Sequence, residues 1–311
     1  MEDFIDPLLA SCYSHTKKQL FSVPWFSDIR VLYYRKDILN KLRIDPSQLS
    51  HWNNLYRVVN IIDEKMHKKI HPMTLSGQSE VIQMHDLAPW IWSSQADFID
   101  LDFRKSSLNK EATLKAIHFY LNLIQGGYIP LLGRDRIRFG NFFTGDSVLQ
   151  VSGTWPVKTI FNPKSKEYNS IVSKNFAIAP FPSVNLNMPS VTFIGGSHLA
   201  ILSSSKYMEE SWALIQFLTS KENQESHAQK VGVLPARKSS FYGDFFDGPW
   251  KEMSVVFQQS IYQARTFSSI PVMGTLEQLI KNLMQDVLNS IRLNAYSKNF
   301  LAQQLEKTSV E

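Results

Sequence analysis

Two histidines have a spacing that could support metal chemistry. His67 and His71 are four residues apart, so a helix would place both on one face, as in helical zinc sites. Zinc would need a third protein ligand, and the Lys-Lys-Ile stretch at residues 68–70 supplies none. We therefore interpret both residues as surface histidines, and we expect no metal and no cofactor.

Acid–base and phosphate chemistry have equally little support. Asp100 and Asp102 would share one face of a strand, but residues 97–102 have the pattern of a turn at a polar surface. The sequence contains neither a glycine-rich phosphate-binding loop nor a G-x-S-x-G nucleophile turn. No residue pattern therefore predicts a catalytic centre.

The composition is that of a folded globular protein. With 311 residues, 43% hydrophobic and 20% charged, the chain can bury one large core or two modest ones. The net charge of +5 is scattered, and no basic stripe interleaved with aromatic residues predicts binding to nucleic acid. Aromatic residues are numerous, with 7 Trp and 11 Tyr, and such rings either fill cores or cover flat apolar ligand faces.

The N-terminus and the single cysteine bear on the compartment. Cys12 has no partner for an intramolecular disulfide, which fits a reducing compartment or an exported bacterial protein. No apolar run has membrane-spanning length, and the acidic start at residues 1–3 lacks the basic region of a signal peptide. Residues 9–12 match the bacterial lipobox pattern, but the apolar stretch before them is too short, so we interpret the match as coincidence.

Hydrophobic periodicity predicts alternating strands and helices. Residues 21–37 read as a strand that enters a helix, with Ile29, Val31 and Tyr33 on one face. Ser50 is the expected cap of the next helix, and Thr275 with Gln278 forms a capping-box pattern at the start of the last long one. The other expected elements are helices near 81–92 and 111–125 and short strands at 148–151, at 176–179 and around Gly195. This alternation predicts an α/β fold with helix-covered sheets.

Segments in a consistent order then resemble one family. The first, residues 21–37, is similar to a "G-V-P-aromatic…D-x-R-x-L-Y-Y-x-K-D" strand, and residues 143–155 are similar to "F-x-x-G-x-A-A-M-x-x-x-G-x-W". The other matching segments are 51–55, 89–92 with 120–130, the strand around Gly195, and 234–236. Together they resemble the extracellular solute-binding proteins of bacterial ABC transporters, in particular the sugar-binding branch.

The resemblance implies a fold and a division of the chain, and the sequence departs from the family pattern in two places. It implies a two-lobed type II periplasmic-binding-protein fold with hinge strands, in which residues 1–34 and 195–311 form the rest of the first lobe with the C-terminal helices. Residues 35–194 form the second lobe. Gln95-Ala96 stands where a glycine pair is common. The chain also begins almost at the hinge strand, so we expect the first lobe to be incomplete.

The resemblance also implies a set of ligand-binding residues. A sugar presents an apolar ring face and a rim of hydroxyls, which call for aromatic platforms and planar polar groups. The implied platforms are Trp25, Trp90, Trp92 and Trp155, and the implied polar groups are Asp28, Arg30 and Arg237. Gly195, Gly196 and Ser197 are expected to let the backbone approach the ligand.

The expected function is reversible capture of a carbohydrate-type solute and its delivery to the membrane permease of an ABC importer. We expect a monomer, in the periplasm or at the cell surface. The alternatives are a glycosidase-like enzyme, for which no acid pair stands out across a cleft, and a truncated, non-functional relative. The sequence does not name the solute.

Overall fold

The computed structural model describes residues 1–14, 19–67, 69–74, 82–100, 105–131 and 141–310 of the chain. They form a mixed α/β structure around two four-stranded sheets, which confirms the predicted fold class. The first sheet has the order β7-β1-β6-β8, with bounds Leu234–Pro235, Val23–Ile29, Thr192–Leu199 and Ala264–Arg265. The second has the order β3-β4-β2-β5, with bounds His71–Thr74, Ser147–Ser152, Val31–Arg35 and Phe176–Ala179.

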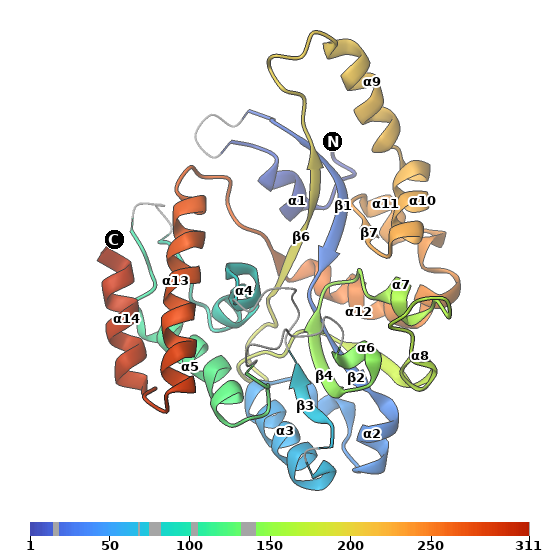
Figure 1. Cartoon of the computed structure of the whole chain (residues 1–311). Coiled ribbons are helices and arrows are strands. Elements are labelled where there is room, and N and C mark those ends of the chain that lie inside the picture. The colour runs from blue at the N-terminus through green and yellow to red at the C-terminus, as the bar shows by residue number, and fades with distance from the viewer. Residues whose placement is uncertain (15–18, 68, 75–81, 101–104, 132–140, 311) are drawn as a thin grey trace.

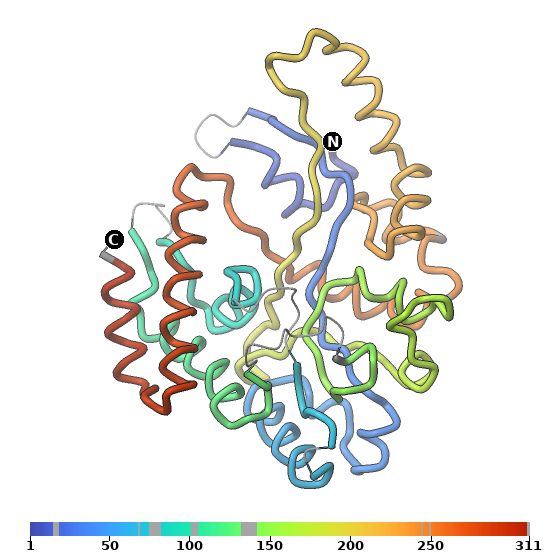
Figure 2. The backbone as a smooth tube through the Cα atoms, viewed as in Figure 1, coloured from blue at the N-terminus to red at the C-terminus, as the bar shows by residue number. Residues whose placement is uncertain are grey.

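A single residue separates a strand of the first sheet from a strand of the second. Arg30 stands between β1, which belongs to the first sheet, and β2, which belongs to the second. Figure 1 shows β1 and β6 running side by side from the upper part of the molecule to its centre, where the second sheet begins. The backbone tube in Figure 2 shows the same two long segments as the spine of the upper half.

Two buried hydrophobic clusters lie on opposite sides of this crossover. Because side chains alternate along a strand, Val31 and Tyr33 pack into one cluster and Leu32 between them into the other. Ile29 joins Val31 and Tyr33, so the predicted alternation through residues 29–33 is confirmed. All four side chains have an exposed fraction of 0%.

Helices cover both sheets. The longer ones carry the apolar stripes that the sequence predicts, for example Leu55, Val58, Val59 and Ile62 of α3, all of them buried. The bounds are α1 Asp6–Ser11, α2 Lys36–Lys41, α3 Trp52–Met66, α4 Met84–Ser93, α5 Glu111–Gln125, α6 Asn141–Thr144, α7 Val157–Ile160, α8 Ser170–Asn175, α9 Met208–Leu218, α10 Lys221–Val231, α11 Lys238–Phe241, α12 Lys251–Tyr262, α13 Met273–Arg292 and α14 Lys298–Val310.

Two predicted helix starts are wrong. α3 is preceded by His51 in extended conformation rather than capped by Ser50, whose own carbonyl accepts from Ser183 N across a bridge. α13 begins at Met273, two residues before the expected capping box, and Gln278 donates to Asn282 instead of reaching back. The backbone of Ser50 thus bridges to Ser183 and the side chain of Gln278 bonds within α13, so neither helix starts where the capping pattern predicts.

The C-terminal helices pack beside α4 and α5 rather than standing apart. α13 contacts α4, and α14 contacts both α13 and α5. Their buried residues join the same hydrophobic cluster as α3, α4 and α5. The predicted division into lobes at residues 34 and 195 stays a prediction, and this packing attaches the C-terminal helices to the half that contains the second sheet.

Gly196 provides a test of how tightly β1 and β6 are joined. Its φ is +146°, and a Cβ there would lie 2.0 Å from the carbonyl oxygen of Phe26 on β1. We expect Gly196→Ala to lower the free energy of unfolding by about 2 kcal/mol or more, because a strained backbone and a clash are added.

The measurement is urea denaturation of wild type and variant, followed by circular dichroism. Gly274→Ala at the start of α13 is the matched control, because a Cβ there meets no atom within 4 Å and the residue has no positive φ. Equal destabilisation by the two substitutions would contradict the assigned role of Gly196.

Candidate functional site

An ion pair lies at the crossover between the sheets. Arg30 Nη1 donates to Asp28 Oδ2 at 2.7 Å, and the side chains of Arg30 and Asp28 are 11% and 18% exposed. The other carboxylate oxygen of Asp28 accepts from Thr154 N at 2.6 Å and from Thr154 Oγ1 at 3.1 Å. Asp28 therefore binds both Arg30, two residues along the chain, and the loop that follows β4.

The glycine at residue 153 makes this approach feasible. A Cβ on Gly153 would lie 2.2 Å from Asp28 Oδ1 and 2.4 Å from Arg30 Nη1. The Gly153 carbonyl accepts from the buried Tyr33 hydroxyl at 2.8 Å. The loop is thus held from both sides, and it places Trp155 beside the crossover, half-buried, with its ring edge-on to Phe143.

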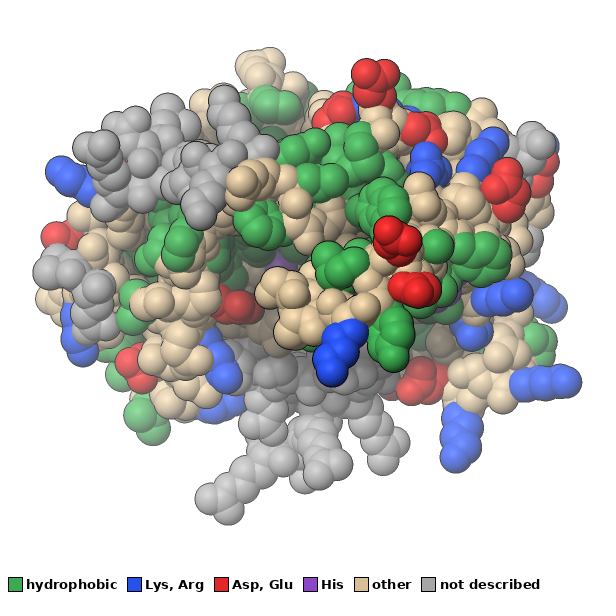
Figure 3. All heavy atoms as spheres, turned by 90° about the horizontal axis from the view of Figure 1, so that it is seen from above, with side chains coloured by type: hydrophobic (Ala, Val, Ile, Leu, Met, Phe, Trp, Pro, Cys, Tyr) green, Lys and Arg blue, Asp and Glu red, His purple; other side chains and the backbone are tan. Residues whose placement is uncertain are grey.

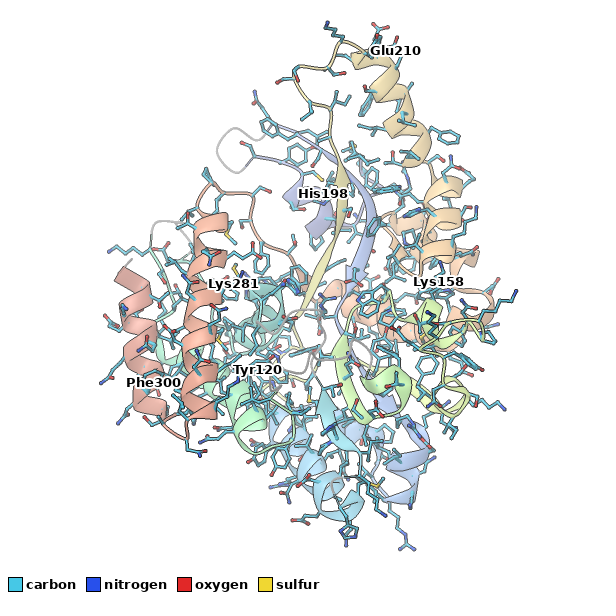
Figure 4. The ribbon with its side chains drawn as sticks, viewed as in Figure 1. Tyr120, Lys158, His198, Glu210, Lys281 and Phe300 are labelled. Atoms are coloured by element: carbon cyan, nitrogen blue, oxygen red, sulfur yellow. The ribbon has the colours of Figure 1, made fainter. Side chains whose placement is uncertain are left out.

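A small recess opens next to the ion pair. Its walls come from Arg30 at the crossover and from β3, β4, α4 and α5, with Tyr120 of α5 labelled near the centre of Figure 4. The lining residues are Arg30, Met73, His85, Asp86, Pro89, Trp90, Tyr120 and Val151. Two buried polar atoms, Arg30 Nε and the Tyr120 hydroxyl, have no hydrogen-bond partner within the described part of the chain. Buried donors of this kind are costly unless a water or a ligand satisfies them.

The first turn of α4 brings two titratable groups to this recess. Asp86 Oδ2 accepts from the backbone N–H of Gln83 at 3.0 Å, and His85 Nε2 lies 3.5 Å from Asp86 Oδ1. Burial raises the pKa of the Asp86 carboxyl, an effect that His85 and Arg30 partly oppose. Burial lowers the pKa of His85, so at neutral pH the imidazole is mainly uncharged. Burial likewise raises the pKa of Tyr120, which stays a neutral hydroxyl.

A second recess lies at the other end of α4. Arg265 of β8 stacks over the Trp92 ring at 4.7 Å and forms an ion pair with Asp97, which also accepts from Trp92 Nε1. Phe267 packs against the Trp92 ring at 5.3 Å. The recess is lined by these residues together with Met84, Phe98, Ile99, Asp100, Thr266, Ser268, Ile270, Met273 and Leu276.

The structure brings some of the sequence-predicted ligand residues together. Asp28 and Arg30 pair at the crossover, and Trp155 follows Thr154, whose backbone N–H donates to Asp28. Trp90 lines the recess beside Arg30, but it is 1% exposed and packs against Phe181 in the core. On β6, Gly195 lies opposite Asp28, and Gly196 and Ser197 lie opposite Ser27 and Phe26. Gly195 also leaves space for the Phe193 ring, which a Cβ would approach to 2.8 Å.

Other predicted residues have partners of their own at some distance in the fold. Trp25 stacks on His227 of α10, with ring centroids 4.4 Å apart. Arg237 donates to the Thr219 carbonyl and to Asp3, and its guanidinium lies over the Phe4 ring. Arg237 therefore fastens the N-terminal segment, and its role as a ligand residue stays a prediction, as does that of Trp25.

Several residues at the two recesses were missed by the sequence analysis. His85, Asp86 and Arg265 carry no motif, while Tyr120 and the Asp28-bound Thr154 entered only as members of matched segments. One usable signal was the polar pair at residues 85–86 inside an otherwise apolar helix pattern. Such a pair on a buried helix indicates polar groups that face a neighbour or a ligand.

Comparison with known proteins decides the family. The sequence profile described as "Bacterial extracellular solute-binding protein" matches residues 2–252, which is most of the chain. The chain belongs to this family. Its members are transporter solute-binding proteins rather than enzymes, and they act outside the cytoplasm.

Relatives in sequence are distant and longer than this chain. A probable ABC transporter-binding protein from Deinococcus radiodurans is 24% identical over 292 residues, which are 83% of this chain and 68% of that protein. The sn-glycerol-3-phosphate-binding periplasmic protein UgpB of Escherichia coli (strain K12) is 24% identical over 247 residues, covering 76% of this chain and 53% of UgpB. The chain thus spans about half to two thirds of these relatives.

Solved structures show the same fold. The GacH receptor of Streptomyces glaucescens superposes with a TM-score of 0.79 at 19% identity and covers 100% of this chain and 76% of its own. The maltose-bound MalE3 of T. maritima superposes with a TM-score of 0.77 at 21% identity, and the match covers 98% of this chain and 75% of MalE3. The type II periplasmic-binding-protein fold expected from the sequence is therefore confirmed.

The described residues contain neither a membrane-spanning helix nor a metal-binding cluster. Within those ranges no helix combines the length and apolar character needed to cross a membrane. Across the same part of the chain, no group of three or more His, Cys, Asp and Glu side chains could hold a metal ion. His67 ends α3 in a left-handed conformation, and Asp102 lies outside the described residues.

The carboxyl of Asp86, whose side chain is 16% exposed, gives the site a measurable pH dependence. Its raised pKa means that the folded chain holds a proton that the unfolded chain releases once the pH exceeds 3.8. Asp86 therefore lowers the free energy of unfolding as the pH rises from 3.8 to its folded-state pKa. Above the folded-state pKa its contribution no longer changes with pH. We expect Asp86→Asn to remove this contribution.

The measurement is the difference in unfolding free energy between wild type and Asp86→Asn at pH 4, 5, 6 and 7. The free energy of unfolding of the variant should increase relative to that of the wild type as the pH rises. Asp63→Asn on α3 is the control, because that carboxyl lies outside the recess. A difference that is flat across this range would contradict a buried, proton-holding Asp86.

Proposed function

We propose that this chain is the substrate-binding component of an ABC importer and that it binds a neutral carbohydrate-type solute at the crossover between the two sheets. The observation that carries the proposal is the recess beside Arg30. There the buried indole of Trp90 lines one recess, next to the crossover, with two polar atoms that have no partner among the described residues, Arg30 Nε and the Tyr120 hydroxyl. Membership in the solute-binding family supplies the general role.

The residue types of the site match the chemistry of a sugar. The ring of a sugar has an apolar face that packs on an aromatic ring. Trp90 lines the recess with 1% of its surface exposed, and Trp155, next to the Asp28-bound Thr154, is half-buried. Sugar hydroxyls both donate and accept hydrogen bonds. Arg30 supplies a donor, the Tyr120 hydroxyl can do either, and neutral His85 presents one donor and one acceptor nitrogen.

Charge balance supports a neutral solute over an anionic one. Arg30 is paired with Asp28 and Arg265 with Asp97, so neither cation of the two recesses is free to neutralise a phosphate. The similar proteins bind several polyhydroxylated solutes according to their names: acarbose for GacH, maltose for MalE3 and sn-glycerol-3-phosphate for UgpB. Among these, the charge pairing here favours the neutral sugars.

The mechanism requires no bond to break. In a two-lobed binder the solute stabilises the closed arrangement of the lobes over the open one by its contacts with both. Asp28 of β1 in the first sheet binds the loop that follows β4 of the second, so it lies where such a change of angle would occur. The closed form would then dock on the permease outside the cytoplasmic membrane, and we propose that the chain acts there as a monomer.

Trp155→Ala tests the aromatic contact. With a panel of neutral sugars at millimolar concentration, we expect one of them to raise the melting temperature of the wild type. A ligand at 100 times its Kd adds about 2.7 kcal/mol of stability to the folded state. We expect this shift to disappear in Trp155→Ala and to remain in Trp212→Ala, which alters a half-exposed tryptophan on α9. An unchanged shift in Trp155→Ala would remove Trp155 from the site.

Arg30→Gln tests the polar contact. The substitution deletes the guanidinium that faces the recess, while Asp28 keeps its two hydrogen bonds from Thr154. We expect affinity for the sugar identified above to fall at least tenfold, because a charge-assisted hydrogen bond contributes about 1.5–3 kcal/mol. Isothermal titration calorimetry measures the effect, with Arg57→Gln on the exposed side of α3 as the matched control. Equal affinity of the two variants would argue against Arg30 as a ligand group.

A further inference from the structure

In the described part of the chain, three stretches run between the first sheet and the half that contains the second sheet. One is Arg30 between β1 and β2, another leads from β5 to β6, and the third, residues 266–272, leads from β8 to α13. Figure 1 shows this third stretch, between α12 and α13, running from the centre of the molecule to the upper end of α13. The arrangement of the two halves depends in part on what holds this stretch in place.

The third stretch borders two recesses. One is the Arg265 recess described above, with a volume of about 100 Å³. The other has a volume of about 520 Å³ and is lined by residues 264–269 and by α1 with the turn after it. Residues 266–268 line both recesses. A segment next to so much open space has fewer packing neighbours than a core segment, so single side-chain contacts decide its course.

Arg265, the last residue of β8, binds the start of this stretch to the other half. Its guanidinium forms an ion pair with Asp97, which follows α4, and lies 4.7 Å from the centroid of the Trp92 ring of α4. Asp97 Oδ1 accepts from Trp92 Nε1 at 3.0 Å, so each of the three side chains contacts the other two. Trp92 is 2% exposed and belongs to the buried cluster of the second half. We call Trp92, Asp97 and Arg265 the clasp.

An aromatic cluster supports the clasp from below. Phe267 packs against the rings of Trp92, Phe98 and Phe193, with ring centroids 5.3, 5.9 and 5.2 Å away. Phe193 of β6 lies opposite Arg265 in the ladder between β6 and β8. These uncharged contacts keep the end of the first sheet close to α4, so the guanidinium has little distance to cross when the ion pair forms.

The ion pair of the clasp is open to solvent. The side chains of Arg265 and Asp97 are 46% and 35% exposed, so water and salt ions reach both charges. An ion pair of this kind stabilises a structure only weakly and is screened by salt. That strength suits a contact that breaks and re-forms, since a strong contact would lock the two halves together.

We propose that the clasp regulates the arrangement of the two halves. While the ion pair is formed it holds the halves as they stand in the structure, and its loss frees them to change their angle. The effect does not pass through the solute, because among the described residues neither Arg265 nor Asp97 lines the recess beside Arg30. The inference rests on the proposed function in one respect, because solute capture there requires a change of angle.

The test measures the arrangement without any solute, so its result is separate from the question of sugar binding. Spin labels are attached to Leu202→Cys and Leu293→Cys in a Cys12→Ser chain, and pulsed electron–electron resonance gives the distribution of distances between them. Both leucines are exposed, one between β6 and α9 and the other after α13. The segment before α9 lies at the top of Figure 1 and faces the viewer in Figure 3, whereas α13 ends at the lower left of Figure 1.

Asp97→Asn removes the ion pair selectively, because the amide oxygen of asparagine still accepts from Trp92 Nε1. At low salt we expect the fraction of molecules at the wild-type distance to fall about twofold in this variant. Wild type in about 1 M salt, where the screening length is about 3 Å, should approach the low-salt distribution of the variant. Arg265→Gln should cause the same change, and the double variant should add nothing to either single one.

Glu111→Gln is the matched control. It breaks an exposed ion pair between Glu111 and Lys115 that lies within α5, so it should leave the distance distribution unchanged. Thermal melts verify that every variant is folded. An unchanged distribution in both Asp97→Asn and Arg265→Gln would overturn the proposal. So would a change that high salt does not reproduce in the wild type, or one that Glu111→Gln causes equally.

Discussion

The carboxylate of Asp28 is the contact on which the geometry of the site depends. It stands at the end of a strand of one sheet and accepts hydrogen bonds from Arg30 at the crossover and from Thr154 after a strand of the other. Partly buried charges of this kind are stable only where several donors replace the water that they lose. Gly153 allows that close approach, and the Tyr33 hydroxyl holds the loop from its other side. The position of Trp155 follows from these bonds.

The two recesses share α4 as a common wall. Its first turn carries His85 and Asp86 to the Arg30 recess, and its last turn carries Trp92 to the Arg265 recess. Burial lowers the pKa of His85 and raises the pKa of Asp86, which favours the neutral form of each. Arg30 and Arg265 each form an ion pair with a carboxylate. The resulting surface is rich in hydrogen-bonding groups with little net charge. That combination suits a polyhydroxylated neutral molecule better than an ion.

The distribution of apolar surface differs between the two halves of the molecule. Around the second sheet, α3, α4, α5, α13 and α14 join in one continuous buried cluster. At the far end of β6, by contrast, α9 leaves most of its apolar side chains in contact with solvent. The first sheet has a buried cluster of its own, so the exposed apolar side chains of α9 are a local feature of that surface.

The sequence by itself determined the fold class, the alternation of side chains through residues 29–33 and the apolar stripe of α3, because these follow from local periodicity. It also singled out Asp28, Arg30, Trp90 and Trp155 as ligand residues, which stays a prediction; of these, Arg30 and Trp90 line the recess and Asp28 pairs with Arg30. Only the tertiary structure decided that His85, Asp86 and Tyr120 join them, since contacts between residues tens of positions apart leave no periodic trace. The same holds for Trp25 and Arg237, whose stacking on His227 and bonds to Asp3 and Thr219 depend on how distant elements pack. The helix starts at Trp52 and Met273 also differ from the capping patterns: the backbone of Ser50 bridges to Ser183, and Gln278 bonds Asn282 within α13.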